Sequence, residues 1–192
     1  MDRVAVFIDA GYLIAEAGKT LYGSGHREEL QVDTRAAIEA LCKRAYELTS
    51  LPILRVYWYD ASAGAMTPEQ SALAYQNNVK VRLGIIVGGR QKGVDSLIVS
   101  DMITLAQNRA ASEMILISGD EDLRIGVQKA QEHGVRVTLL LIGSPSRNAS
   151  PLLVQEADCR GTFLGWLGTT MERPIKGACD DTGRLFGSRG AG

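Results

Sequence analysis

The sequence predicts an α/β protein, built as a three-layer α/β/α sandwich around a mainly parallel central sheet. Two continuous apolar runs, Val4–Ile8 and Met114–Ile117, indicate strands that are covered on both faces. Strands of this kind are typical of parallel sheets. Segments with helical periodicity or helix caps lie between the strands, and the connections are short. This alternation of strand and helix is what a single layered domain requires.

The first half of the chain is expected to contain two strands and three helices. A strand opens the chain, and a helix follows it up to the loop at Tyr22–His26. Asp33 or Thr34 is expected to cap the next helix, whose apolar residues recur about every 3.6 residues until Pro52. The other expected elements are the strand Val4–Ile8, the helix from Ala10 to about Leu21, the strand Ile53–Tyr59 ending at Asp60, and a short helix that follows Pro68 and ends near Asn77 and Asn78.

The second half begins with a strand of mixed character. Val79–Val87 starts with strict alternation, so Lys80 and Arg82 are expected on one face. Gly88 and Gly89 then turn the chain. The remaining expected elements are a helix from Asp95 to about Arg109, the strand Met114–Ile117, a helix Asp120–His133 ended by Gly134, the strand Val135–Ile142, a short helix Ser150–Ala157 and an edge strand Thr162–Leu167.

The apolar pattern is lost near Gly168, where Gly, Arg and Asp accumulate. We therefore expect one domain over residues 1–167 and a mostly disordered tail over residues 168–192. The net charge of −1 excludes a strongly basic, histone-like surface, and three widely spaced cysteines give neither a disulfide framework nor a zinc signature. No signal peptide is visible and no apolar stretch approaches about 18 residues, so a cytoplasmic protein without membrane association is expected.

Aspartates follow two of the predicted strands. Asp9 closes the first strand, and Asp120 and Asp122 come just after the strand that ends at Ile117. Ligands of open parallel sheets bind beyond the carboxyl ends of the strands, so these acids are expected in one pocket. Each could also cap a helix, but three successive acids around Glu121 repel one another unless a cation compensates. Carboxylates without His or Cys suit Mg²⁺ or Mn²⁺.

Two further acids lie in the helix that starts near Asp95. Asp101 falls inside the apolar stripe of this helix, three residues after Ile98 and four before Leu105. A carboxylate in that position needs a cation, a metal or a raised pKa, and an arginine partner is the alternative to a metal. Asp95 itself could serve as a helix cap or as a metal ligand.

Basic residues precede this acidic helix. Lys80, Arg82, Arg90 and Lys92 could hold the backbone of a phosphodiester substrate beside metal-binding carboxylates, although a solvated strand face would look the same. The glycines of Gly88–Gly93 have the spacing of a P-loop, but Val94 and Asp95 replace its Lys-Ser/Thr pair. The turn after the first strand also lacks the Gly-rich dinucleotide pattern.

Taken together, three segments resemble the NYN domain, a branch of the PIN-like nuclease superfamily, and especially its bacterial LabA-like members. They are Val6-Phe7-Ile8-Asp9-Ala10-Gly11, then Lys92-Gly93-Val94-Asp95 leading to Ser100-Asp101, and Ile117-Ser118-Gly119-Asp120-Glu121-Asp122-Leu123. Leu152-Leu153 with Ala157-Asp158 is similar to the closing segment of the family. The resemblance covers about residues 1–167.

This resemblance implies a PIN-like, Rossmannoid fold and Mg²⁺- or Mn²⁺-dependent cleavage of RNA, with endonucleolytic cleavage as the expected mode. Asp9, Asp101 and Asp120 would be the core metal ligands, completed by Asp95 and Asp122 directly or through water. Substrate would be held by Lys92 and Arg90, and Ser118 would bond an Asp or a phosphate.

One position departs from the family pattern, because Tyr12 stands where many relatives have Asn. Its ring could stack on a base or pack against the sheet. RNA is the expected partner, and homo-oligomers are compatible with the sequence. The alternatives are a non-catalytic NYN-fold module that binds RNA or protein, and a small-molecule binder or phosphatase.

Overall fold

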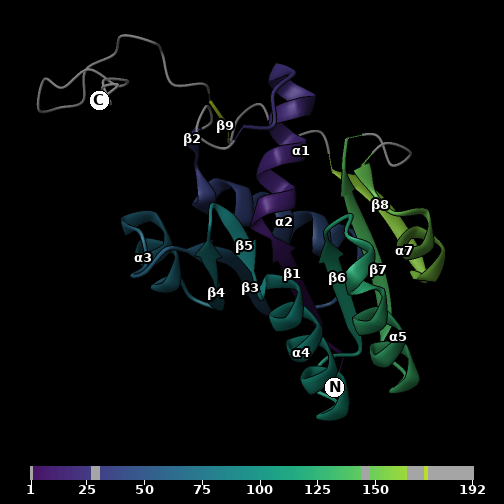
Figure 1. Ribbon diagram of the computed structural model, residues 1–192. Helices are drawn as coiled ribbons and strands as arrows, with labels where there is room; N and C mark the ends of the chain where they lie inside the picture. Colours follow the sequence, from purple (N-terminus) through teal and green to yellow (C-terminus); the bar gives the residue numbers. More distant parts are fainter. Residues whose placement is uncertain (1, 27–30, 144–147, 164–170, 173–192) are drawn as a thin grey trace, which may run out of the picture.

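A seven-stranded sheet forms the centre of the protein in the computed structural model, which describes residues 2–26, 31–143, 148–163 and 171–172 (Figure 1). The strand order is β5-β4-β3-β1-β6-β7-β8, and every neighbouring pair is parallel except β4 and β5. The strands are β1 (Val4–Asp9), β3 (Ile53–Ser62), β4 (Val79–Val87), β5 (Arg90–Lys92), β6 (Glu113–Ile117), β7 (Arg136–Ile142) and β8 (Cys159–Phe163). The predicted, mainly parallel α/β fold is confirmed.

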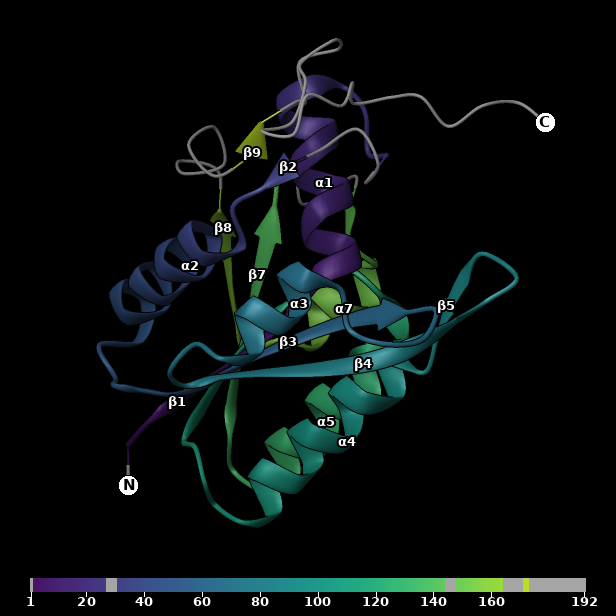
Figure 2. The same cartoon turned by 90° about the vertical axis from the view of Figure 1, so that its left-hand side faces the viewer.

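Helices cover both faces of this sheet and complete three layers (Figure 2). On one face, α1, α2 and α3 pack over Val6, Ile8 and Trp58, while α4, α5 and α7 pack on the opposite face over Phe7 and Leu116. β1 lies at the centre and alternates its buried side chains between the two cores. The helices are α1 (Ala10–Tyr22), α2 (Thr34–Thr49), α3 (Pro68–Ala74), α4 (Val94–Gln107), α5 (Arg124–Glu132) and α7 (Pro151–Glu156).

Helix caps stand directly after the strands and fix where the helices begin. Asp9 ends β1 and caps α1, and Asp33 caps α2 as expected. The helix predicted from Asp120 to His133 instead starts with one 3₁₀ turn, η2 (Glu121–Leu123), which Asp120 caps before α5 begins. The consequence is that Asp9 and Asp120 are held at the same edge of the sheet.

Several element boundaries differ from the sequence-based expectations. β3 runs past Asp60 to Ser62, and Asp60 is buried and accepts a hydrogen bond from the Gln70 side chain at 2.9 Å. The short strand β5 was not predicted, and β8 starts at Cys159, before the expected edge strand. Most of that expected edge strand, residues 164–167, lies outside the described residues.

Little of the predicted disordered tail falls within the described residues. Of residues 168–192, only Met171–Glu172 are described, and they form strand β9, which pairs antiparallel with β2 (Gln31–Val32). The domain boundary at residue 167 therefore stays a prediction. Over the described ranges, none of the helices combines the length and apolar composition needed to cross a bilayer.

The β4–β5 hairpin folds tightly over Gly84. A Cβ atom at this position would lie 2.5 Å from the Lys92 carbonyl oxygen and 2.9 Å from a Val94 methyl group. A new methyl group would force the Lys92 backbone to move, which costs more than the shift of a flexible side chain. Gly84→Ala should therefore lower the free energy of unfolding by about 1–3 kcal/mol in urea denaturation. Gly64→Ala is the matched control, since a Cβ there meets nothing within 4 Å. Equal stability of the two variants would contradict this packing.

Candidate functional site

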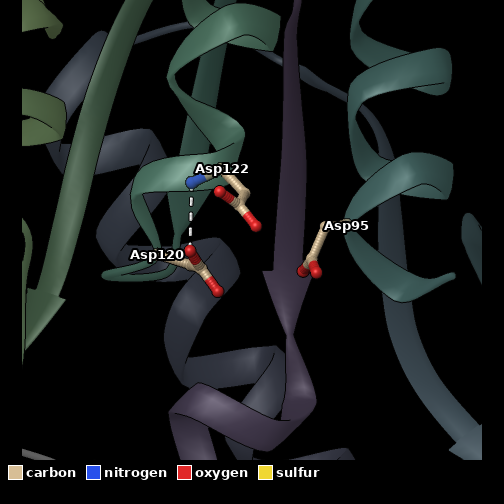
Figure 3. A group of neighbouring side chains, drawn as sticks. All are labelled: Asp95, Asp120 and Asp122. Carbon is tan, nitrogen blue, oxygen red and sulfur yellow. Dashed lines mark hydrogen bonds between the residues drawn. The ribbon is translucent and has the colours of Figure 1, made fainter. Parts of the chain in front are cut away.

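Three aspartates from two separate parts of the chain meet at the carboxyl edge of the sheet. Asp95, Asp120 and Asp122 each offer a carboxylate oxygen, and these oxygens lie within 4.8 Å of one another (Figure 3). We call these three residues the acidic cluster. Asp120 and Asp122 are exposed and come from η2 and its cap, whereas Asp95 is half-buried in the first turn of α4.

Local hydrogen bonds orient the cluster. One oxygen of Asp120 accepts a hydrogen bond from the backbone N–H of Asp122 at 3.0 Å, the dashed line in Figure 3. Asp95 does not cap its helix, because Gly93 is the N-cap residue of α4, with a positive φ of 83°, and no side-chain cap bond is made. Among the described residues, no protein donor is hydrogen-bonded to the carboxylate of Asp95 or of Asp122, so both are available to a ligand.

The electrostatics of Asp95 follow from this position. Burial is the main cause of its raised pKa, and the charges of Asp120, Asp9 and Asp122 raise it further. Each of these effects opposes a negative charge at Asp95. A cation placed among the three carboxylates would reverse the effect of the neighbouring charges, and hard oxygen donors of this type match Mg²⁺ or Mn²⁺.

Asp9 lines the same cleft as Asp95 and Asp120, and both of its carboxylate oxygens are already hydrogen-bonded. One accepts the Tyr12 backbone N–H at 3.1 Å and the other accepts the Ser118 hydroxyl at 2.9 Å. Burial raises the pKa of Asp9, these hydrogen bonds oppose the rise, and the charge of Asp120 adds to it. Asp9 thus shares the site, but it is not one of the three acids whose oxygens converge.

Ser118 connects Asp9 to the cluster. Its hydroxyl is fully buried and also accepts the backbone N–H of Asp120 at 3.3 Å. The expected hydrogen bond from Ser118 to an Asp is therefore present, and it is made with Asp9.

Asp101 has a different environment from the one that the resemblance implied. It does not lie in the acidic cluster, and one of its oxygens accepts the Tyr59 hydroxyl at 2.9 Å and the Arg82 guanidinium at 3.0 Å. Burial and the Asp101 charge raise the pKa of Tyr59, which keeps its hydroxyl a donor. The geometry matches the alternative considered from the sequence, an acid bonded to arginine, and gives no support to Asp101 as a core ligand.

The acidic cluster borders a cleft of about 470 Å³. Tyr12 forms part of its wall, but the Tyr12 hydroxyl accepts the Ile142 backbone N–H at 3.3 Å, and burial raises its pKa to about 12. A Cβ at Gly119 would contact the Tyr12 ring at 2.8 Å, so the ring packs closely on that backbone. The cleft is lined by Asp9, Gly11, Tyr12, Ala15, Gln91, Val94, Asp95, Ser118 and Asp120.

The β4–β5 hairpin contributes one residue to the wall of the cleft. Gln91 is the β5 residue that lines it, a contact that sequence reasoning missed. The predicted substrate-binding residues Arg90 and Lys92 flank Gln91 and are exposed, but they are not among the lining residues. The Gly88–Gly89 turn directly after β4 was the available signal for a returning strand.

Comparison with known proteins identifies the family. The sequence model of the NYN domain matches residues 3–164, from the residue before β1 to just past β8. The chain belongs to the NYN domain family. This family is PIN-like and related to nucleases, which confirms the resemblance seen in the three acidic segments. The NYN match includes every residue of the acidic cluster.

The relatives extend the comparison without adding an activity. An uncharacterized protein, y4oD, from Sinorhizobium fredii (strain NBRC 101917 / NGR234) is 53% identical over 109 residues, which are 56% of this chain and 50% of that protein. The chain therefore spans about half the length of this curated relative. The crystal structure of a protein of unknown function, VPA0982, from Vibrio parahaemolyticus RIMD 2210633 has a TM-score of 0.59 at 19% identity, covering 84% of this chain and 93% of that one. This likeness concerns the fold alone.

Proposed function

We propose that this NYN domain is a metal-dependent ribonuclease that hydrolyses phosphodiester bonds of RNA at the acidic cluster. The observation that carries the proposal is the convergence of Asp95, Asp120 and Asp122, one of them half-buried and without a bonded donor in the described structure. Keeping such carboxylates together costs free energy in the absence of a cation. Membership of a nuclease-related family supports the same chemistry.

In this proposal the three acids of the cluster would hold one Mg²⁺ or Mn²⁺ ion. The bound cation would polarise the phosphate and lower the pKa of water for attack on phosphorus. Asp9 would position the cluster indirectly. It accepts the Ser118 hydroxyl, and the same hydroxyl accepts the backbone N–H of Asp120. Asp101 would act at a distance, by holding Arg82 on the α4 side of the sheet.

Substrate would enter along the cleft beside the β4–β5 hairpin. Gln91 reaches the cleft and could hydrogen-bond a phosphate or a base, while the exposed cations Arg90 and Lys92 on either side would attract the RNA backbone. The acids lie at the surface and not at the end of a tunnel, since Asp120 and Asp122 are exposed. A strand could therefore continue past the cluster in both directions, which favours cleavage of internal bonds. A cytoplasmic location fits this proposal.

Metal-dependent cleavage is the first test. We expect the purified protein to cut labelled single-stranded RNA in Mn²⁺ or Mg²⁺, to lose the activity in excess EDTA, and to regain it when Mn²⁺ is restored. Cleavage of a circular RNA would establish the endonucleolytic mode, since a circular molecule has no ends for an exonuclease to attack. A parallel DNA substrate shows whether the site requires RNA. Cleavage that survives EDTA, or no cleavage with either ion, would contradict the proposal.

A non-catalytic NYN module is the second candidate. The specific observation in its favour is that three of the five predicted acids, Asp9, Asp101 and Asp120, already accept hydrogen bonds from protein donors. Such a module would bind RNA in the assay above and leave it intact in either metal.

A further inference from the structure

A second groove begins on the other side of the acidic cluster. It runs between α4 and α5, has a volume of about 560 Å³, and includes Asp95 and Asp122 in its lining. These two helices lie side by side in both ribbon views (Figures 1 and 2). Because Asp95 also lines the first cleft, the acidic cluster stands at the boundary between the two hollows.

Close packing of the two helices forms the floor of this groove. A Cβ at Gly126 of α5 would lie 3.2 Å from the Met102 sulfur and 3.3 Å from a Val99 methyl group of α4. The absence of a side chain at Gly126 therefore lets α5 approach α4 at this point. The groove lies next to this helix contact, and Asp95 and Asp122 of the acidic cluster are among its lining residues.

The lining of the groove differs from that of the first cleft in chemistry. Apart from Asp95 and Asp122 it carries no charged side chain: its other lining residues are Ser96, Val99, Ser100, Ile103, Thr104 and Ile125. Ser96, Ser100 and Thr104 recur every four residues and so form one row along α4. Ile125 faces this row from α5 and leaves 47% of its surface exposed.

A groove with this lining suits the base and ribose of a nucleotide better than its charged phosphate. A phosphate would find no cation in the groove and would face two carboxylates at its mouth. A base can lie against the apolar side chains of Ile125, Ile103 and Val99, while ribose hydroxyls or base edges can hydrogen-bond the serine hydroxyls. The exposed cations Arg90 and Lys92 belong instead to β5, whose Gln91 lines the first cleft.

We infer that the groove between α4 and α5 binds the base and ribose of the nucleotide that adjoins the scissile phosphodiester. This inference rests on the proposed ribonuclease function, because it places the scissile phosphate at the acidic cluster. The RNA strand would then cross the cluster from the cleft beside the β4–β5 hairpin into the groove. Recognition in the groove would favour single-stranded RNA, whose bases are free to lie against a protein wall.

Truncation of Ile125 tests the groove. We expect Ile125→Ala to weaken the binding of a short single-stranded RNA about fivefold or more, because a base loses its apolar contact. Binding is measured by fluorescence anisotropy of the labelled RNA in a buffer that contains Ca²⁺. In the cleavage assay the same variant should raise KM with little change in kcat. Leu152→Ala is the matched control, since Leu152 is a similarly exposed aliphatic residue on α7, with 42% of its surface exposed, and lines neither hollow.

The outcomes separate this inference from the proposed function. If wild type binds and cuts RNA while Ile125→Ala behaves like Leu152→Ala, the groove inference is overturned and the nuclease stands. If wild type binds RNA without cutting it and Ile125→Ala weakens that binding, base binding in the groove is supported, whereas the nuclease and the placement beside a scissile bond are overturned. A wild-type protein that binds no RNA overturns both.

Discussion

Asp120→Asn is expected to lower the rate of metal-dependent RNA cleavage by about a hundredfold or more. Replacement of residues that merely support a metal ligand already costs about 10- to 100-fold, and Asp120 would be a ligand itself. The fold should be retained, because an asparagine oxygen can still accept the Asp122 backbone N–H that Asp120 now accepts at 3.0 Å. Single-turnover cleavage, with circular dichroism to verify folding, measures the effect.

Two further variants make this result specific. Asp33→Asn changes an N-cap of the same kind, since Asp33 accepts the Ala36 N–H at 2.9 Å on α2, and it should leave cleavage unchanged. Asp101→Asn should reduce cleavage far less than Asp120→Asn, because Asp101 is bonded to Arg82 and Tyr59. If Asp101→Asn were the more damaging of the two, Asp101 would be a core ligand, as the family resemblance implied.

Binding of Mn²⁺ is expected to stabilise the native protein strongly. At a free ion concentration of about 100 times Kd, a ligand that binds only the native state adds about 2.7 kcal/mol. For a domain of this size that corresponds to a rise in melting temperature of roughly 5–10 °C. Asp95→Asn should lose most of this increment, because Asp95 is the half-buried member of the acidic cluster, where a lost carboxylate charge is least replaced by solvent.

The same substitution should have the opposite effect on the metal-free protein. The pKa of Asp95 lies above its ordinary value of 3.8, so the native state keeps this proton to higher pH than the unfolded chain does. The contribution of Asp95 to the stability of the wild type then falls as the pH rises from the unfolded to the native pKa of this group, and the loss persists at neutral pH. Asp95→Asn lacks this loss, so in EDTA at pH 7 it should melt at a higher temperature than the wild type.

Thermal melts from pH 3 to pH 8, with EDTA or with Mn²⁺, test both statements. Wild type and Asp95→Asn should converge in EDTA at the acid end, where the Asp95 carboxyl is protonated in both the native and the unfolded wild type. Asp33→Asn should respond to Mn²⁺ as the wild type does. A metal-free Asp95→Asn that is less stable than wild type at pH 7, or a wild type indifferent to Mn²⁺, would be inconsistent with three repelling carboxylates that share an ion.

Much of the site could be predicted because local rules determine it. Parallel neighbours end at one edge of the sheet, so Asp9 and Asp120 had to lie close once β1 and β6 were recognised as buried strands. Repulsion among successive acids likewise pointed to Asp122. The sequence also indicated that a helix starts near Asp95, and Asp95 indeed lies in the first turn of α4. These inferences need only the strand pattern, the helix caps and the charges.

Other parts of the site depend on pairings that no local pattern reveals. Helical periodicity placed Asp101 in an apolar stripe, but its partners Arg82 and Tyr59 lie 19 and 42 residues away in sequence. Gln91 belongs to a three-residue strand of exposed polar side chains, which lacks the apolar alternation that identifies longer strands. The hydrogen bond between the Ile142 backbone N–H and the Tyr12 hydroxyl joins residues that are 130 positions apart in sequence.

The β4–β5 hairpin is attached to the sheet along a single edge, through β4. Lengthening or shortening it at Gly88 and Gly89, where a Cβ would meet nothing within 4 Å, would change how far this wall reaches while the packed interior stays as it is. Under the proposed function, such a change would alter which RNA fits the cleft without altering the acids that would carry out hydrolysis.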